Sequence, residues 1–78
     1  TKQLLELLAK RMRISREIGV YKKEHNMPIL QSPRYSEILE KRSNMGEQMD
    51  LSTDFVKEIL KEIHEESVRQ QMIIMNEQ

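Results

Sequence analysis

The stretch TKQLLELLAKRMRISREIGVYKKE, residues 1–24, decides the fold of this chain. Its helix propensity is high, and Gly19 is the only weak helix former inside it. We therefore predict one long helix over about residues 1–24. The segment His25-Asn26-Met27-Pro28 ends it, because a proline cannot continue a helix and disfavours helical geometry in the residue before it.

Two further helices are predicted, each opened by a residue type that caps helix N-termini. The predicted helices and their caps are residues 33–46 with Ser32, and residues 53–76 with Ser52 or Thr53. Pro33 suits the first helical position, where its missing N–H costs nothing, and Gly46 weakens the end of the second helix. The predicted fold class is all-α, with three helices in a single domain of residues 1–78.

Composition excludes several functional classes. The 78 residues leave room for one small domain, and 13 basic and 13 acidic residues give a formal net charge of zero. Nucleic-acid binders and membrane-surface modules need a basic excess, so neither partner is expected. There is no cysteine for disulfides or thiolate metal sites, and no apolar run approaches the roughly 18 residues that span a bilayer. Without a signal peptide either, we expect a soluble, cytoplasmic protein.

The length of the first helix predicts a homodimer. A helix of about 24 residues is roughly 36 Å long, whereas a compact globule of this size is roughly 30 Å across. The helix therefore overhangs anything its own chain can build, and its apolar stripe either stays wet or packs against a second copy. Its start shows no recognisable cap, so we also expect more helix upstream.

Two cations interrupt the apolar face of this helix. At about 100° per residue, that face consists of Leu4, Leu7, Leu8, Ile14 and Ile18. Arg11 and Lys22 lie near its middle, about 16 Å apart along the axis. Burying unpaired cations is costly, so an anion must meet them. That anion is either an acidic side chain of another helix or a ligand. A further alternative is that each long side chain extends to the edge of the face and keeps its charge in water.

Polar residues also stand out on the other two helices. Ser67 interrupts the inner face of the third helix, and Gln71 follows one turn later, so both can contact one bound group. Arg34 lies in the first turn of the second helix, where free N–H groups favour an anion. The alternative for all three is an ordinary solvated side chain.

Other kinds of site find little support. His25 and His64 lack the spacing of metal ligands, and His64-Glu65-Glu66 is interpreted as a charged helix face. Neither a Ser-His-Asp arrangement nor a glycine-rich phosphate loop is present. We predict no metal and no cofactor.

Read in order, these residues resemble the all-helical chorismate mutases. The matching segments are Leu7-Leu8-Ala9-Lys10-Arg11, Ile18-Gly19, Tyr21-Lys22, Pro28-Ile29, Arg34, Glu66-Ser67-Val68 and Gln71. The resemblance implies an intertwined homodimer of three-helix chains that rearranges chorismate to prephenate in phenylalanine and tyrosine biosynthesis. It is compatible with a free enzyme or with one domain of a fusion to a shikimate-pathway enzyme.

The resemblance also implies roles for single residues. Arg11 would bind a substrate carboxylate, while Lys22 would reach a carboxylate and the ether oxygen of the breaking C–O bond. Gln71 would donate an N–H to that same oxygen. Ser67 would contact a carboxylate, and Arg34 would help to fix the ring-hydroxyl end. Of these, Lys22, Gln71 and Arg11 are the predicted catalytic residues.

Three features depart from the family pattern. Tyr35 stands where many members carry a glutamate that holds the ring hydroxyl, and Gln31 stands where many carry an aspartate. We include both among the predicted substrate-binding residues. The family also lends an arginine from the start of the first helix to the partner's site, and that position would lie upstream of Thr1.

Two other functions remain open from the sequence. An isochorismate-pyruvate lyase uses a similar fold, a similar ligand and an equivalent lysine. A non-catalytic helical dimerisation or regulatory module would instead bury Arg11 and Lys22 in intersubunit salt bridges.

Overall fold

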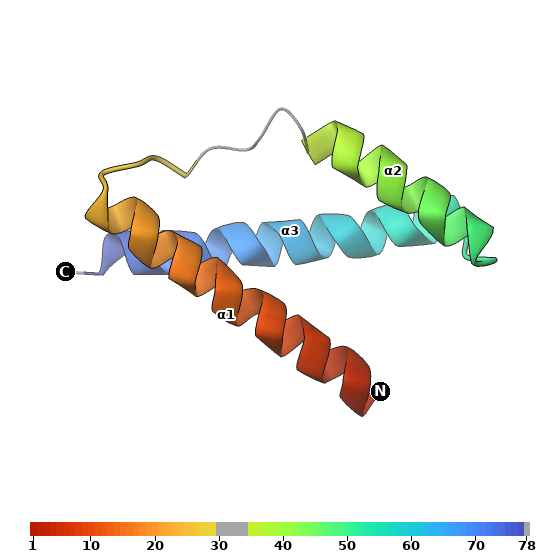
Figure 1. Cartoon of the computed structure of the whole chain (residues 1–78), viewed down its shortest axis with the longest axis horizontal. Helices are drawn as coiled ribbons and strands as arrows, with labels where there is room; N and C mark the ends of the chain where they lie inside the picture. Colours follow the sequence, from red (N-terminus) through yellow and green to blue (C-terminus); the bar gives the residue numbers. More distant parts are fainter. Residues whose placement is uncertain (30–34, 78) are drawn as a thin grey trace. The chain divides into compact units, whose positions relative to one another are not determined.

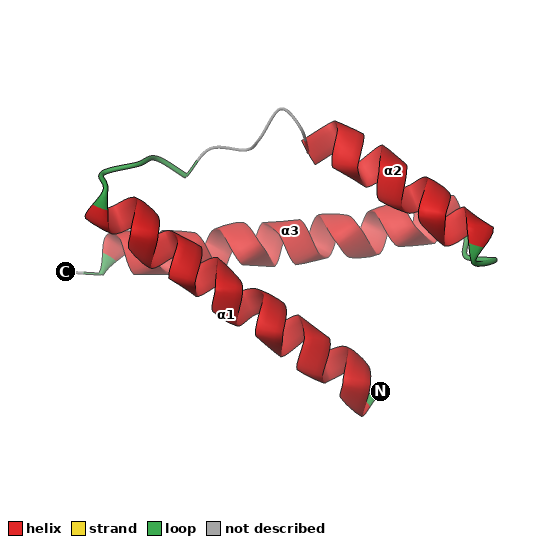
Figure 2. Ribbon diagram, viewed as in Figure 1, coloured by secondary structure: helices red, strands yellow, loops and turns green. Residues whose placement is uncertain are grey.

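The computed structural model describes residues 1–29 and 35–77. These residues form three helices and no strand (Figures 1 and 2). The helices are α1 (Lys2–Glu24), α2 (Tyr35–Gln48) and α3 (Thr53–Asn76). The predicted all-α class with three helices is confirmed. The expected cap Ser32 and first-turn Pro33 lie outside the described residues.

Both α1 and α2 end in the same backbone motif. Asn26 and Asp50 adopt left-handed backbone conformations, with φ of 54° and 64°. The next residue in each case, Met27 or Leu51, donates its N–H to a carbonyl five residues earlier. This Schellman pattern satisfies carbonyls that the helix end leaves free, and short polar side chains tolerate its left-handed residue. Asn26 therefore helps to end α1 before Pro28 is reached.

The start of α3 is capped from the preceding turn. The Phe55 N–H lies 3.4 Å from the Ser52 side-chain oxygen, and the Val56 N–H donates to the Ser52 carbonyl at 3.0 Å. Ser52 is therefore the N-cap among the two predicted candidates. Asp54 follows in the first turn, where the helix dipole favours a negative charge.

Contacts divide the chain into two compact units, one of residues 1–29 with 65–78 and the other of residues 30–64. In the first unit, α1 packs against the C-terminal part of α3. In the second unit, α2 packs against the N-terminal part of α3. A single domain over residues 1–78 stays a prediction.

In each unit, a glycine lies directly against the facing helix. A Cβ on Gly19 would meet the Gln71 Cα at 3.1 Å and the Ile74 Cβ at 3.2 Å. A Cβ on Gly46 would meet Val56 Cγ2 at 2.7 Å, well inside contact distance. Gly46 thus lies inside α2, which runs on to Gln48. Gly46 lowers the helix propensity of α2, but because it has no side chain it permits α2 to pack closely against Val56 of α3.

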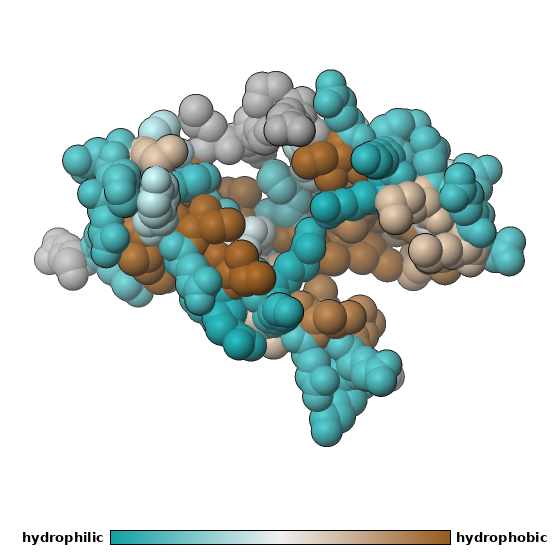
Figure 3. Space-filling view, in the orientation of Figure 1, coloured by the Kyte–Doolittle hydropathy of each residue, from teal (hydrophilic) through white to brown (hydrophobic). Residues whose placement is uncertain are grey.

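The buried side chains in the described part of the chain are polar. Its buried residues are Ser15, Ser43 and Gln71 with the two glycines, and no large apolar side chain is buried. Leu4, Leu7, Ile14 and Ile18 of α1 are all exposed by 42% or more. Apolar side chains accordingly reach the surface in the space-filling view (Figure 3). The apolar stripe of α1 is therefore uncovered within its own unit.

Replacing Gly46 with alanine tests the close approach in the second unit. We expect Gly46→Ala to lower the free energy of unfolding by about 1 kcal/mol, because the clash with the stiff Val56 side chain outweighs the gain in helix propensity. Chemical denaturation measures it. The control Asn44→Ala, at an exposed position of the same helix, should raise stability by roughly 0.5 kcal/mol. A Gly46→Ala protein as stable as this control would contradict the packing argument.

Candidate active site

Lys22 and Gln71 form the polar centre of the first unit. The Lys22 Nζ donates a hydrogen bond to the Gln71 Oε1 over 3.1 Å. Gln71 is only 8% exposed, whereas Lys22 is half-buried. An amide whose oxygen already accepts from an ammonium group turns its NH₂ away from that cation. The pair therefore offers an ammonium group and an amide N–H, both hydrogen-bond donors, from two different helices.

The close helix crossing makes this pair possible. Gly19 lies three residues before Lys22, so the two share one side of α1. With only a hydrogen at Gly19, the backbone of α3 at Gln71 approaches α1 directly. The lysine is then close enough to reach across to the glutamine of the facing helix. This crossing fixes both side chains on helices rather than on loops.

A second polar contact lies further along the same crossing. The Ser15 Oγ donates to the Arg11 carbonyl at 3.1 Å, one turn back on α1. The Ser15 and Ser67 oxygens are 2.5 Å apart. Because the Ser15 proton is engaged by the carbonyl, Ser67 is the donor between the two hydroxyls. To donate to a ligand, Ser67 must first give up this bond.

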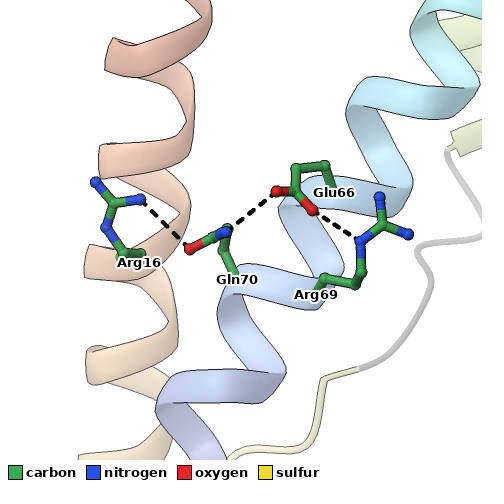
Figure 4. Close-up of polar contacts among 4 residues, drawn as sticks. All are labelled: Arg16, Glu66, Arg69 and Gln70. Carbon is green, nitrogen blue, oxygen red and sulfur yellow. Dashed lines mark hydrogen bonds and ion pairs between the residues drawn. The ribbon is translucent and has the colours of Figure 1, made fainter.

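A chain of side-chain bonds lies on the flank of the crossing (Figure 4). Arg16 donates to the Gln70 Oε1 at 3.4 Å, and the Gln70 Nε2 donates to Glu66 at 3.2 Å. Arg69 donates to the other Glu66 oxygen at 2.7 Å. These bonds, that from Arg69 foremost, lower the pKa of Glu66 below its ordinary value of 4.5. The network joins α1 to α3 beside the Lys22–Gln71 pair.

The predicted site residues of the first unit are placed as follows. Lys22 and Gln71 are in direct contact, and Ser67 lies at the same crossing. Arg11 is exposed, and its guanidinium has no partner among residues 1–29 and 35–77. The ion pairs found in those residues are Lys2–Glu6, Lys57–Glu40 and Arg69–Glu66. Neither Arg11 nor Lys22 is thus neutralised by an acidic side chain of the described chain.

The remaining predicted site residues lie elsewhere. Gln31 and Arg34 are outside the described residues. Tyr35 is the first residue of α2 and stacks on His64 within the second unit. The interpretation of His64 as part of a charged helix face is wrong, because its ring is half-buried against Tyr35. The spacing of His64 could have indicated its position, because it lies three residues before Ser67 and thus near the same helix face.

The described residues offer neither a metal site nor a membrane-spanning helix. Their His, Asp and Glu side chains form no group of three or more that could hold a metal ion. None of their helices is both long and apolar enough to span a membrane.

Comparison with known proteins assigns the family. A sequence model of the family described as chorismate mutase type II matches residues 1–72. The chain belongs to this family. The predicted resemblance to the chorismate mutases is thereby confirmed.

Two curated relatives agree with the family assignment. A bifunctional chorismate mutase/prephenate dehydratase of Buchnera aphidicola subsp. Schizaphis graminum (strain Sg) is 35% identical over 75 residues, which cover 96% of this chain and 20% of the relative. The T-protein of Enterobacter agglomerans is 32% identical over 66 residues, 85% of this chain and 18% of that protein. The chain thus spans about a fifth of the length of these relatives. The comparison with solved structures found no match.

The Glu66 network predicts a specific acid sensitivity. A carboxyl whose pKa is lowered on folding stabilises the folded state above its unfolded pKa, and this contribution is lost as pH falls through the folded pKa. We therefore expect Glu66→Gln to lose less thermal stability than the wild type between about pH 5 and pH 3. Thermal melts across this range measure the difference.

The matched control is Glu62→Gln, an exposed glutamate one turn earlier on α3. Its acid-side stability profile should run parallel to that of the wild type. Parallel profiles for Glu66→Gln and the wild type would show that the Glu66 bonds contribute nothing in solution.

Proposed function

We propose that this chorismate mutase domain rearranges chorismate to prephenate with Lys22 and Gln71 at the reacting ether oxygen. The observation that supports this proposal is the direct bond from the Lys22 Nζ to the Gln71 Oε1. It leaves the Gln71 N–H groups without a partner among the described residues. Two donors held side by side suit one oxygen atom that gains negative charge.

The rearrangement needs hydrogen-bond donors at the ether oxygen, and Lys22 and Gln71 carry such donors. The rearrangement is unimolecular and pericyclic, so it requires no nucleophile, metal or cofactor. The protein must hold the diaxial, chair-like conformer and stabilise the negative charge that develops on the ether oxygen. A million-fold acceleration corresponds to roughly 8 kcal/mol of differential stabilisation. Binding carboxylates stabilises ground and transition states alike, so Lys22 and Gln71 must supply the difference at the ether oxygen.

The uncompensated cations favour a dianionic ligand. Arg11 has no partner in the described chain, and the Lys22 side chain bonds a neutral amide rather than a carboxylate. Both positions can therefore take up a substrate carboxylate without first breaking an ion pair of the described chain. In this proposal Arg11 binds one carboxylate, and Ser67 exchanges its bond with Ser15 for a second. Arg34, Gln31 and Tyr35 complete the site at the ring-hydroxyl end.

The exposed stripe of α1 supports a homodimer as the working form. Leu4, Leu7, Ile14 and Ile18 lie at helical spacing on one face and stay exposed in the single chain. The contacts of α1 with α3 instead involve Ser15, Gly19 and Lys22. A second copy that packs its own α1 alongside would bury both stripes at once. We propose this dimer in the cytoplasm, either as a free enzyme or within a longer fusion protein.

Removing the Lys22 ammonium tests the catalytic assignment. In the full-length natural protein we expect Lys22→Met to lower kcat/KM for chorismate by about 100- to 1,000-fold, the usual cost of one preorganised donor. The helical circular dichroism spectrum should stay unchanged. Lys10→Met, at an exposed position of the same helix, should keep wild-type activity. The readout is the loss of chorismate absorbance, with the product identified by chromatography.

Two outcomes would contradict this assignment. Pyruvate release from isochorismate, without prephenate formation from chorismate, would favour the lyase. Unfolding or dissociation of Lys22→Met without any wild-type turnover would favour a non-catalytic module with Lys22 in an intersubunit salt bridge.

A charge in the apolar stripe tests the dimer. We expect Leu7→Glu to raise the dimer dissociation constant by about 100-fold or more, because an unpaired carboxylate buried at the interface costs several kcal/mol. Sedimentation velocity over a range of concentrations measures this shift. Ala9→Glu adds the same charge on the opposite side of α1 and should leave the dimer intact. A wild-type protein that sediments as a monomer would overturn the proposal.

A further inference from the structure

Ser15 is a buried serine on the face of α1 that meets α3 within the first unit. The residue is only 5% exposed. It follows Arg11 by four residues and precedes Lys22 by seven, and residues at these spacings share one face of a helix. Ser15 therefore lies between the two cations that are proposed to bind substrate. So far it has no part in the proposed function beyond being the group that Ser67 leaves.

In the ligand-free protein the two hydroxyls form a short chain of hydrogen bonds. Ser67 donates to the Ser15 Oγ, and the Ser15 Oγ donates to the Arg11 carbonyl at 3.1 Å. A serine hydroxyl has one proton to donate and lone pairs with which to accept. Both protons are engaged inside the chain in this arrangement, so neither hydroxyl has a proton for a ligand.

The same pair of hydroxyls can be connected in the opposite direction. When the Ser15 hydroxyl turns from the Arg11 carbonyl to the Ser67 Oγ, the proton of Ser67 becomes available to a carboxylate. The two oxygens are 2.5 Å apart, so a bond between them can form in either direction. The Arg11 carbonyl still accepts from a backbone N–H of α1. The reversal therefore leaves neither hydroxyl proton without an acceptor.

We propose that Ser15 is a positioning residue that donates to Ser67 when Ser67 binds a substrate carboxylate, an inference that rests on the proposed mutase function. The bond from Ser15 directs the Ser67 proton toward the ligand. A hydroxyl that accepts a hydrogen bond is polarised, and it becomes a stronger donor itself. Ser15 thus acts on the substrate through Ser67 and does not touch it.

This role predicts which kinetic constant changes. The carboxylate that Ser67 contacts is charged in the ground state and in the transition state alike. Its bond to Ser67 therefore stabilises both states, and weakening that bond raises KM while kcat stays nearly constant. A loss of packing at the α1–α3 crossing would instead displace Lys22 and Gln71 and lower kcat, because these residues are proposed to act at the ether oxygen.

Ser43 in the second unit provides an internal comparison. It is 1% exposed, and its hydroxyl donates to the Leu39 carbonyl at 2.7 Å, one turn back on α2. Ser15 makes the same type of bond to its own helix. Within the described residues, however, Ser43 has no hydrogen bond to a second side chain, whereas Ser15 meets Ser67 across the helix contact. The contact with another hydroxyl distinguishes Ser15 from a buried serine that only bonds its own helix.

The test measures kcat and KM for chorismate separately in the full-length natural protein. We expect Ser15→Ala to raise KM by about 3- to 10-fold, the value of one neutral hydrogen bond, with kcat within about 2-fold of the wild type. Ser15→Cys fills nearly the same space but is a weak donor, so its KM should rise as well. Ser43→Ala serves as the matched control and should change neither constant.

A double-mutant cycle shows whether Ser15 acts through Ser67. In a Ser67→Ala background, Ser15→Ala should change KM by less than about 2-fold. An equal rise of KM in both backgrounds, or a wild-type KM in Ser15→Cys, would assign Ser15 a packing role and overturn the inference. An unchanged or lowered KM in Ser15→Ala would overturn it too, because Ser15 would then not support the bound state.

These outcomes leave the proposed function intact, because the wild type still converts chorismate in each of them. A wild type that does not convert chorismate would remove the mutase function and this inference with it.

Discussion

The close approach of Gly19 to the backbone of Gln71 is the constraint on which the candidate site depends. A side chain at position 19 would push α1 away from α3, and the Lys22 Nζ would no longer reach the Gln71 amide at 3.1 Å. Glycine weakens a helix by about 1 kcal/mol relative to alanine, so its presence in the middle of α1 has a local cost. That cost is offset by a crossing at which an ammonium group and a neutral amide meet on rigid helices.

The crossing is polar, and this explains why the chain has so little core of its own. Ser15, Ser67, Lys22 and Gln71 occupy the α1–α3 contact, while the leucines and isoleucines of α1 remain exposed. A chain of 78 residues also buries a smaller fraction of its surface on folding than a larger domain does. Polar groups at the helix contact therefore leave the apolar stripe for a partner to cover. In the proposed dimer, the apolar residues of α1 pack against the second copy, while its polar residues Ser15 and Lys22 contact α3.

Local rules predicted the helices, whereas tertiary contacts decided the details. Capping residues and helix breakers located three helices, but propensity alone could not show that Gly46 lies inside α2 against Val56. The helical wheel gave the direction of Lys22, and the family resemblance paired it with Gln71. A wheel describes one helix, so it could not show that Ser67 bonds Ser15 or that Arg16, Gln70 and Glu66 form a chain. His64 was missed because its partner, Tyr35, is distant in sequence.

A crystal structure of the full-length protein with a bicyclic ether dicarboxylate, shaped like the chair-like transition state, tests the central claim most directly. The account predicts that the Lys22 Nζ and the Gln71 Nε2 both lie within hydrogen-bond distance of the ether oxygen. The arginine at position 11 should contact a carboxylate. An ether oxygen without either donor, and Lys22 paired instead with an acidic side chain of a second copy, would contradict the account.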